Sequence, residues 1–416
     1  MRISVIGAGY VGLTSGACFA RLGNEVVLID IDRQKVKAIN GTTSPVYEEG
    51  LSELLSQVDI KVGSDYQQAT NSEAIFICVG TPPNEDGSVS LGQITEATKE
   101  ISQLLKRKED YCVVTVKSTV PPGTTEELVI PILAQSGKRV GRDFGVCMSP
   151  EFLREGKAIY DFMNPARVII GEYDKGSGDM LLNLYCSFNA PILRTDLKTA
   201  EMIKLASNAF LATKVSFINE IGNICKQLGI DVYEVAKGMG VDDRIGSKFL
   251  NAGIGFGGSC LPKDLSMLVA RAKEIGYEPR ILEEVSNLNE KQALKPIELL
   301  KKHVPLKGAS IGLLGLAFKP GTDDVRESRA IKVVDALLGE GAIIKAYDPL
   351  GVENFKKLFP QIQYLSQKEE ALTCDAVIII TEWEEFNELD YRDKIVIDGR
   401  RIPKAMEARI YEGVCW

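Results

Sequence analysis

The first part of the chain alternates short apolar runs with amphipathic segments. The apolar runs are rich in β-branched residues and occur in RISVIGAGYVG, EVVLIDID, EAIFICVGTPP, YCVVTVKSTVPPGT and FGVCMSPEFL. Segments with helical spacing of apolar residues, such as GQITEATKEISQLLKR, separate them. Because strands that alternate with helices usually form a parallel sheet covered on both faces, the pattern predicts an α/β domain over residues 1–196.

The pattern changes near residue 197. The segment LKTAEMIKLASNAFLATKVSFINEIGNICKQLG contains no proline, and its apolar residues recur with a helical period. This predicts one long helix, of the kind that bridges domains or lines a subunit interface. Further helical segments follow, so we expect a helical middle domain over residues 197–304, carrying Lys204 and Cys260 and mediating dimerisation.

The last part of the chain repeats the order of the first. Apolar runs return in ASIGLLGLAF, AIIKAYDP, DAVIIITEW and KIVIDGR, which predicts a second α/β domain over residues 305–416. Only Gly312 and Gly315 stand where a dinucleotide fingerprint would need three glycines, so this domain need not bind a dinucleotide. The expected fold class is α/β, with two Rossmann-like parallel-sheet domains joined by a long central helix and a helical middle domain.

Composition and charge limit the kinds of partner that the protein can bind. The 416 residues are 45% hydrophobic and carry a net charge of −8, which argues against nucleic-acid and anionic-membrane partners. No apolar run approaches the ~20 residues of a membrane span, and we expect a cytoplasmic protein. Nine cysteines without a CxxC pair favour reduced thiols. The single histidine, His303, argues against a histidine base and against a metal site, so no metal is expected.

A dinucleotide fingerprint opens the chain. Gly7, Gly9 and Gly12 follow the first predicted strand and begin a helix, whose N-terminus can receive a pyrophosphate. Asp30 ends the second predicted strand, where a carboxylate accepts hydrogen bonds from a ribose and repels a 2′-phosphate. The expected cofactor is therefore NAD and not NADP, although the neighbouring cation Lys35 weakens this preference because it could pair with a 2′-phosphate.

One cysteine has an unusual setting, in GFGGSCLPKD. The glycines let the backbone approach a ligand, and Pro262 suits the first turn of a helix. Cys260 would then lie at the positive end of that helix beside Lys263, and both favour the thiolate. Asp264 could act on a water or on the thiol proton. A purely structural cysteine is the alternative.

A nicotinamide cofactor combined with a thiolate suggests a four-electron oxidation. The cofactor can take a hydride from an alcohol, and the thiolate can add to the resulting aldehyde. A second hydride transfer then gives a thioester, which water converts to an acid.

Lys204 and Asn208 lie four residues apart in the predicted long helix and so share one face. An ammonium and an amide on a mostly apolar helix are costly if buried without partners, which makes them candidate site residues. A solvated polar stripe is the alternative.

The motifs in this order, over essentially the whole chain, resemble the UDP-glucose 6-dehydrogenase family among the nucleotide-sugar dehydrogenases. The segments that carry the resemblance are GAGYVG, VGTPP followed by EDGS, KSTVPPGT, SPEFLREG, NAFLATKVSFINE, DDRIGSKFL, GFGGSCLPKD, GLAFKPGTDDVRES and the terminal DGR. The central segments look more like the UDP-glucose branch than the UDP-N-acetylmannosamine branch. Two departures stand out: Arg329 follows VRES where the family commonly has proline, and VSLGQI follows DGS where an acidic start is usual.

The resemblance implies roles for particular residues. Cys260 is implied as the nucleophile, Lys204 as the group that stabilises oxyanions, and Asp264 as the group that orients water. The implied catalytic set is completed by Asn208, Thr119 and Glu151. The implied cofactor contacts are Gly7, Gly9, Tyr10, Val11, Gly12, Asp30, Lys35, Thr81, Pro82, Thr119, Glu155, Lys263 and Arg326. The implied substrate contacts are Glu151, Phe152, Leu153, Lys204, Asn208, Arg244, Phe249, Asn251, Gly257, Phe318, Lys319 and Arg400.

The expected function is NAD-dependent oxidation of UDP-glucose to UDP-glucuronate. The resemblance also implies a homodimer or larger homo-oligomer in which Arg244 reaches the UDP-sugar of the neighbouring subunit. It leaves Arg401 as an alternative to Arg400 as the substrate contact. Three other functions stay open: a dehydrogenase of a UDP-N-acetyl-hexosamine, a two-electron lysine-dependent hydroxyacid dehydrogenase that would not need Cys260, and a catalytically silent NAD-binding sensor.

Overall fold

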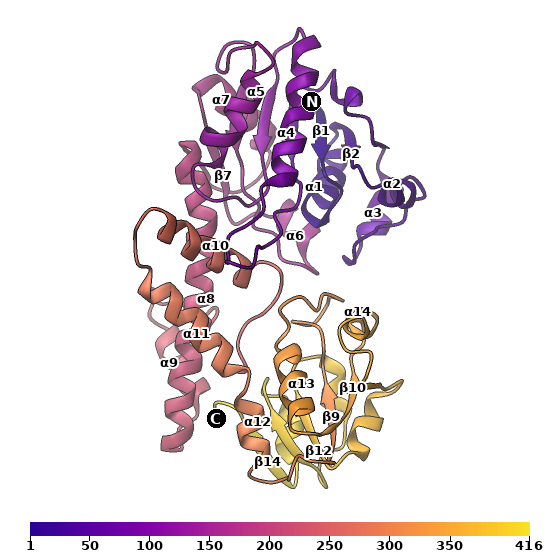
Figure 1. The fold of residues 1–416 in the computed structure, drawn as a ribbon, viewed down its shortest axis with the longest axis vertical. Coiled ribbons are helices and arrows are strands. Elements are labelled where there is room, and N and C mark those ends of the chain that lie inside the picture. Colours follow the sequence, from indigo (N-terminus) through magenta and orange to yellow (C-terminus); the bar gives the residue numbers. More distant parts are fainter. The chain divides into compact units, whose positions relative to one another are not determined.

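The computed structural model describes residues 1–416, which divide into two compact units, residues 1–207 and residues 208–416 (Figure 1). The division falls within α8 (Leu197–Leu228), a helix of 32 residues. The predicted long helix is therefore confirmed. The predicted domain limits at residues 196 and 304 stay predictions.

The first unit is built on an eight-stranded sheet in the order β3-β2-β1-β4-β5-β6-β7-β8. Its strands are β1 (Arg2–Ile6), β2 (Glu25–Ile29), β3 (Ile60–Gly63), β4 (Ala74–Ile77), β5 (Val113–Val116), β6 (Gly145–Met148), β7 (Val168–Glu172) and β8 (Ile192–Thr195). The six strands from β3 to β6 run parallel, as predicted. β7 pairs antiparallel with β6, and β8 runs parallel to β7, a reversal that the sequence pattern did not reveal.

Helices cover both faces of this sheet. Alternate residues of β1 point to opposite faces, so Val5 joins one apolar cluster and Ile6 another. The first cluster includes residues of α1 (Tyr10–Arg21), α3 (Leu51–Gln57), α6 (Ala158–Met163) and α7 (Lys175–Tyr185). The second includes residues of α4 (Gly92–Arg107), the π-helix η2 (Thr125–Val129) and α5 (Ile130–Ala134). The remaining helical segments are α2 (Arg33–Asn40) and the 3₁₀ turn η1 (Tyr66–Ala69).

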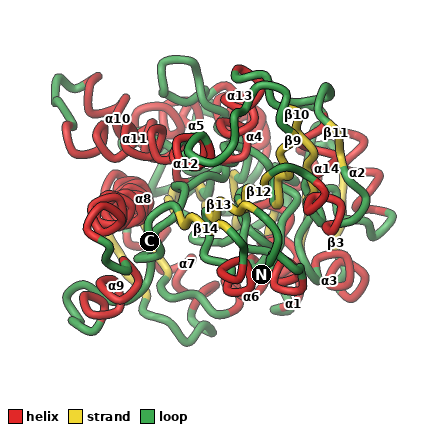
Figure 2. Tube along the Cα trace, turned by 90° about the horizontal axis from the view of Figure 1, so that it is seen from below, coloured by secondary structure: helices red, strands yellow, loops and turns green.

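The second unit begins with helices. After α8 the chain forms α9 (Val232–Gly240), α10 (Leu261–Glu274), α11 (Arg280–Gln292) and α12 (Lys295–Leu300), in agreement with the predicted helical segments. α10 and α11 lie side by side (Figure 2). Together with α8 they enclose a small apolar cluster that includes Phe256, from the glycine-rich loop before α10.

A second sheet completes this unit, with six parallel strands in the order β11-β10-β9-β12-β13-β14. They are β9 (Ser310–Leu314), β10 (Ile343–Tyr347), β11 (Gln363–Tyr364), β12 (Ala376–Ile379), β13 (Ile395–Asp398) and β14 (Ile410–Gly413). Helical segments connect them: α13 (Arg329–Gly339), α14 (Val352–Lys356), η3 (Lys368–Thr373), η4 (Glu384–Glu388) and η5 (Pro403–Glu407). The predicted fold class is confirmed.

The two sheets start in the same way. Gly7 follows β1 with φ +100°, and Gly315 follows β9 with the same φ, a left-handed conformation that favours glycine. The sequence echo between the two α/β segments thus corresponds to a shared first turn. None of the helices has the length and apolar character that crossing a membrane requires.

Candidate active site

The loop after β1 forms a cradle that only glycine permits. A Cβ at Gly7 would lie 2.8 Å from the carbonyl oxygen of Cys78, and one at Gly12 would collide with the carbonyl oxygen of Gly7. α1 then begins at Tyr10, and no side chain caps its N-terminus. Open N–H groups at a helix start, reached through a close-packed glycine turn, suit a pyrophosphate.

Asp30 follows β2, as the fingerprint requires. Its carboxylate accepts hydrogen bonds from the N–H groups of Ala8 (2.6 Å) and Asp32 (2.8 Å), and Lys35 Nζ lies 3.9 Å away. The first of these bonds fixes the carboxylate against the glycine loop. Each oxygen keeps capacity for a second donor, so the geometry fits the ribose of NAD.

Glu48 ties the cofactor loop to a distant segment. Its buried carboxylate accepts hydrogen bonds from the N–H groups of Gly156 and Ala158, each at 2.6 Å, and from the Tyr10 hydroxyl. Burial and the Glu48 carboxylate raise the pKa of Tyr10 far above its ordinary value, so the phenol stays a donor. Sequence analysis missed Glu48 because a glutamate in a polar loop carries no local signal.

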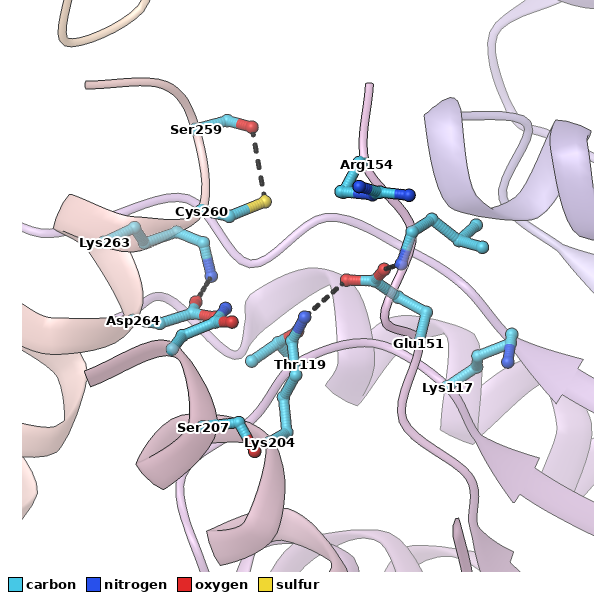
Figure 3. Close-up of polar contacts among 12 residues, drawn as sticks. Lys117, Thr119, Glu151, Arg154, Lys204, Ser207, Ser259, Cys260, Lys263 and Asp264 are labelled. Atoms are coloured by element: carbon cyan, nitrogen blue, oxygen red, sulfur yellow. Dashed lines mark hydrogen bonds and ion pairs between the residues drawn. The ribbon is translucent and has the colours of Figure 1, made fainter. Parts of the chain in front are cut away.

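Lys204 and Glu151 form a buried ion pair (Figure 3). Lys204 Nζ lies 2.8 Å from Glu151 Oε1, and the two residues are 3% and 7% exposed. Glu151 Oε2 also accepts a hydrogen bond from the Leu153 N–H at 2.6 Å. Burial alone would raise the pKa of Glu151, but the Lys204 ammonium and the Leu153 N–H hold that pKa below its usual value. Phe152 lies alongside, with its ring centre 5.4 Å from Lys204 Nζ.

Two threonines meet where β4 and β5 end. The Thr81 hydroxyl donates to the carbonyl oxygen of Thr119 at 3.0 Å, which joins the VGTPP and KSTVPPGT loops at the carboxyl edge of the sheet. Glu201, one turn before Lys204 on α8, fixes the second loop from the other side. It accepts hydrogen bonds from the Gly123 N–H (2.6 Å), the Thr125 N–H (2.8 Å) and the Thr125 hydroxyl (2.6 Å). Burial raises the pKa of Glu201 to about 7 against these bonds.

In the second unit Cys260 stands immediately before α10, with Pro262 in the first turn, so the predicted helix start is confirmed. Its Sγ lies 3.6 Å from the Ser259 hydroxyl (Figure 3). Asp264, 1% exposed, accepts hydrogen bonds from the Asn208 amide (2.6 Å) and from Lys263 Nζ (2.8 Å). Three of the predicted residues, Asn208, Lys263 and Asp264, are thus brought together.

Buried amides hold the glycine-rich loop that leads to Cys260. The N–H of Gly253 donates to Asn219 Oδ1, and its carbonyl oxygen accepts from Gln292, both at 2.7 Å. Asn289 pairs with both backbone groups of Phe256, at 2.8 Å and 3.0 Å. The loop therefore has amide side chains from α8 and α11 as partners in place of a neighbouring strand. The sequence gives no signal for this, because isolated Asn and Gln on a helix usually face solvent.

Glycines also set the approach between this loop and the segment after β9. A Cβ at Gly257 would collide with the carbonyl oxygen of Glu327, and one at Gly258 would lie 2.6 Å from the Phe318 ring. Lys319 Nζ lies 5.6 Å from the centre of the same ring. Gly257, Phe318 and Lys319 are therefore neighbours.

The two arginines of the terminal DGRR have different partners. Arg400 Nε donates to the carbonyl oxygen of Ile380 at 2.7 Å and lies 3.3 Å from Glu382, and its Nη2 lies 3.5 Å from the carbonyl oxygen of Gly255. Arg401 forms a bidentate pair with Asp231 at 2.8 Å and 2.6 Å, and its guanidinium lies over the ring of Tyr233. Arg401 is thus engaged in holding α9, and Arg400 is the arginine beside the glycine-rich loop.

The other predicted residues are more exposed. Arg244 has an 88% exposed side chain and pairs with Asp242. Phe249 is partly exposed with φ +63°, and Asn251 is exposed. Arg326 is exposed and pairs with Asp324. Val11, Leu153 and Glu155 are half-buried, and Pro82 is exposed.

Three family domains match the chain in order. The NAD binding domain of the UDP-glucose/GDP-mannose dehydrogenase family matches residues 1–189, its central domain residues 198–291 and its UDP binding domain residues 312–405. The chain belongs to the UDP-glucose/GDP-mannose dehydrogenase family. As a member it is an NAD-dependent oxidoreductase, and the cradle around Gly7, Gly12 and Asp30 lies in the domain that binds the cofactor.

Individual relatives match over their whole length. The UDP-glucose 6-dehydrogenase AglM of Haloferax volcanii is 42% identical, with all of both chains covered. The structure of a UDP-glucose dehydrogenase from Pyrobaculum islandicum is 41% identical, with a TM-score of 0.97 over 100% of this chain and 98% of that one. A UDP-D-ManNAc dehydrogenase from Pyrococcus horikoshii is 30% identical, with a TM-score of 0.88 over 100% and 99% of the two chains.

Arg329, which departs from the sequence common in the dehydrogenase family, is buried at the start of α13. Its guanidinium donates to Glu290 and to the carbonyl oxygen of Glu327, both at 3.0 Å. A proline at a first helical position fixes the backbone through its ring. Here the Arg329 guanidinium holds the same turn by its ion pair with Glu290, and its hydrogen bond to Glu327 holds the carbonyl group that packs against Gly257.

Proposed function

We propose that this dehydrogenase oxidises C6 of UDP-glucose twice, giving UDP-glucuronate and consuming one water. NAD, when bound, accepts one hydride in each oxidation, so two NADH form per UDP-glucose. The observation that carries the proposal is the position of Cys260. The start of α10 and the neighbouring Lys263 both favour a thiolate there, and a dehydrogenase that stops at the aldehyde or ketone does not require one.

The proposed steps balance around Cys260. The first oxidation removes a hydride from C6 and a proton from its hydroxyl, giving an aldehyde. The thiolate adds to this aldehyde and forms a C–S bond, and the oxygen takes up a proton to give a thiohemiacetal. Loss of a second hydride from C6 and of the hydroxyl proton gives a thioester. Water then adds, the C–S bond breaks, and the carboxylate and the thiolate are released.

The side chains around the pair of Lys204 and Glu151 suit the charges that develop. An ammonium held in a buried site stabilises the oxyanions formed during addition and hydrolysis. Glu151 is held as a carboxylate, so it can accept the proton of the attacking water. We assign Asn208 and Asp264, which hydrogen bond to each other, to orienting the reacting hydroxyl and the water, together with Thr119.

The UDP-sugar contacts remain part of the proposal. We assign the diphosphate and sugar to Gly257, Phe318, Lys319 and Arg400, within the UDP binding domain and the loop beside it, and further contacts to Phe152, Leu153, Phe249 and Asn251. A few local cations allow a protein of net charge −8 to bind a diphosphate. A UDP-N-acetyl-hexosamine is the second candidate, favoured by the likeness to the Pyrococcus horikoshii enzyme, although the UDP-glucose relatives are more similar.

We further propose a homodimer built on α8. Phe210, Phe217, Ile224 and Leu228 are all exposed and recur at intervals of seven, seven and four residues, which places them along one stripe of the helix. An exposed apolar stripe of this length indicates a protein partner. In such a dimer the exposed Arg244 would reach the UDP-sugar of the neighbouring subunit.

NADH absorbance tests the reaction. With limiting UDP-glucose and excess NAD, we expect two NADH per sugar, and little NADH with UDP-N-acetyl-hexosamines. Cys260→Ser should abolish overall turnover, whereas Cys186→Ser, at an exposed cysteine, is the matched control and should turn over normally. A yield of one NADH per sugar, or turnover by the Cys260→Ser variant, would contradict the proposal.

A further inference from the structure

Asp398 is a buried carboxylate at the end of β13, where the chain turns into the arginine pair. It is 0% exposed. Oδ1 accepts a hydrogen bond from the Arg400 N–H at 2.8 Å, and Oδ2 accepts from the Ile402 N–H at 2.7 Å and the Tyr411 hydroxyl at 3.2 Å. One side chain therefore fixes the backbone of the whole turn over residues 398–402.

This turn sends two adjacent arginines to different partners. Arg401 has φ +58°, a left-handed conformation that is strained for an arginine and must be held by its surroundings. Its guanidinium is bound to Asp231, while the Arg400 guanidinium lies at the carbonyl groups of Ile380 and Gly255. The orientation of Arg400 toward the glycine-rich loop thus depends on the backbone that Asp398 holds.

Each group that hydrogen bonds to the Asp398 side chain donates to it, so the carboxylate is the form that fits this arrangement. The ionisable groups that face it are Arg400, Arg401, Tyr233, Tyr391 and Tyr411. Burial raises the pKa of Asp398 to about 6, against the opposing hydrogen bonds from Arg400, Ile402 and Tyr411. Burial also raises the pKa of each of the three tyrosines, which therefore stay neutral around that pH.

We propose that Asp398 is a positioning residue that aims Arg400 at the UDP-sugar, and that protonation of Asp398 loosens the turn and weakens UDP-sugar binding. A protonated oxygen would point an O–H at a backbone N–H, which can only donate, or at the Tyr411 hydroxyl, which would have to turn and accept it, so at least one of the three hydrogen bonds would be lost or reversed. The inference rests on the proposed function in one respect, that Arg400 contacts the UDP-sugar.

Titration calorimetry of UDP-glucose into the full chain without NAD tests this. The diphosphate of UDP-glucose is a diester and does not titrate in the range used. From about pH 8 to about pH 5 we expect the affinity to fall on the order of tenfold, the effect of one hydrogen bond to a charged group, with a midpoint near the pKa of Asp398. Asp398→Asn keeps the shape of the side chain and should bind weakly at every pH, without this transition.

Tyr411→Phe provides a second variant with a directional outcome. Loss of the hydroxyl donor makes the Asp398 carboxylate less favourable, so the midpoint should move to higher pH. Tyr364→Phe is the matched control, since its hydroxyl donates to the carbonyl oxygen of Phe359 in the same α/β segment, and it should leave the midpoint unchanged.

The outcomes separate the two proposals. UDP-glucose binding without pH dependence, or a wild-type pH profile in Asp398→Asn, would overturn the role of Asp398 alone. A complete lack of UDP-glucose binding at every pH would overturn the proposed function as well. Circular dichroism of each variant across the same pH range verifies that the folded state is being measured.

Discussion

Glu48→Gln should destabilise the first unit and weaken NAD binding together. The glutamate accepts hydrogen bonds from Gly156, Ala158 and Tyr10 through its two oxygens. An amide offers one oxygen, so the other position would present an NH₂ group to a backbone N–H. A buried donor left unpaired costs about 1–3 kcal/mol, and the remaining bonds lose the assistance of a charge. We therefore expect the free energy of unfolding to fall by about 2–3 kcal/mol.

The functional consequence follows from which segments Glu48 joins. Tyr10 begins the helix at which we expect the pyrophosphate to bind, and Gly156 directly follows Glu155, a predicted cofactor contact. A loosened connection should raise the Kd for NAD on the order of tenfold, equivalent to about 1.4 kcal/mol. Urea unfolding measures the first effect, and fluorescence titration with NAD measures the second.

Glu49→Gln is the matched control for both measurements. Glu49 is the exposed neighbour of Glu48, so the same chemical change there should alter neither the unfolding midpoint nor the Kd. If Glu48→Gln behaves like Glu49→Gln in both assays, the carboxylate does not organise the cofactor loop. A loss of stability with unchanged NAD affinity would refute only the coupling to the cofactor site.

Three further predictions concern other buried or paired charges. Lys204→Met and Glu151→Gln should each lower the free energy of unfolding by about 3 kcal/mol or more, because each leaves a buried charge without its partner. The double variant should lose less stability than the sum of the two single variants, which a double-mutant cycle in urea measures. Arg400→Ala should raise the KM for UDP-glucose at least tenfold in steady-state kinetics. Arg401→Ala should change that KM little but lower the free energy of unfolding by about 1 kcal/mol, which urea unfolding measures. Burial raises the pKa of Glu201 from 4.5 to about 7, so between these pH values the folded chain retains a proton that the unfolded chain releases. The free energy of unfolding should therefore fall as the pH rises from 4.5 to about 7 in the wild type but not in Glu201→Gln, which unfolding at a series of pH values measures.

The parts of the site that sequence predicts are those fixed by local chemistry. The glycines of the first turn follow from close backbone approach, and the helix start at Cys260 follows from Pro262 two residues later. The pairing of Lys204 is different, because spacing on the helix identifies the lysine but not Glu151, which lies 53 residues away. Partners of this kind depend on tertiary packing.

The residues that sequence analysis missed share one physical feature. Glu48, Glu201 and Asp398 are acidic side chains whose partners are backbone N–H groups of turns, and any turn offers such groups. Asn289 and Gln292 serve the loop before Cys260 in the same way. These residue types are common on protein surfaces, and only their burial in the folded structure distinguishes them from surface residues. The reversal of β7 and β8 is equally invisible, since parallel and antiparallel strands can share one apolar pattern.

These buried carboxylates also bear on how an acidic protein handles anionic ligands. Loops at the carboxyl edge of an α/β sheet must leave regular hydrogen bonding to make room for a ligand, which creates unpaired N–H groups. Glu48, Glu201 and Asp398 satisfy such groups, so three of the 57 acidic residues direct their charge into the fold and away from the ligands. The same arrangement makes the loops dependent on ionisation, because a protonated carboxyl accepts fewer donors. The two groups with a raised pKa should respond to mild acid in opposite ways: at Asp398 the loss of a hydrogen bond should loosen the turn before Arg400, whereas at Glu201 the folded state holds the proton, so mild acid should favour the folded loop.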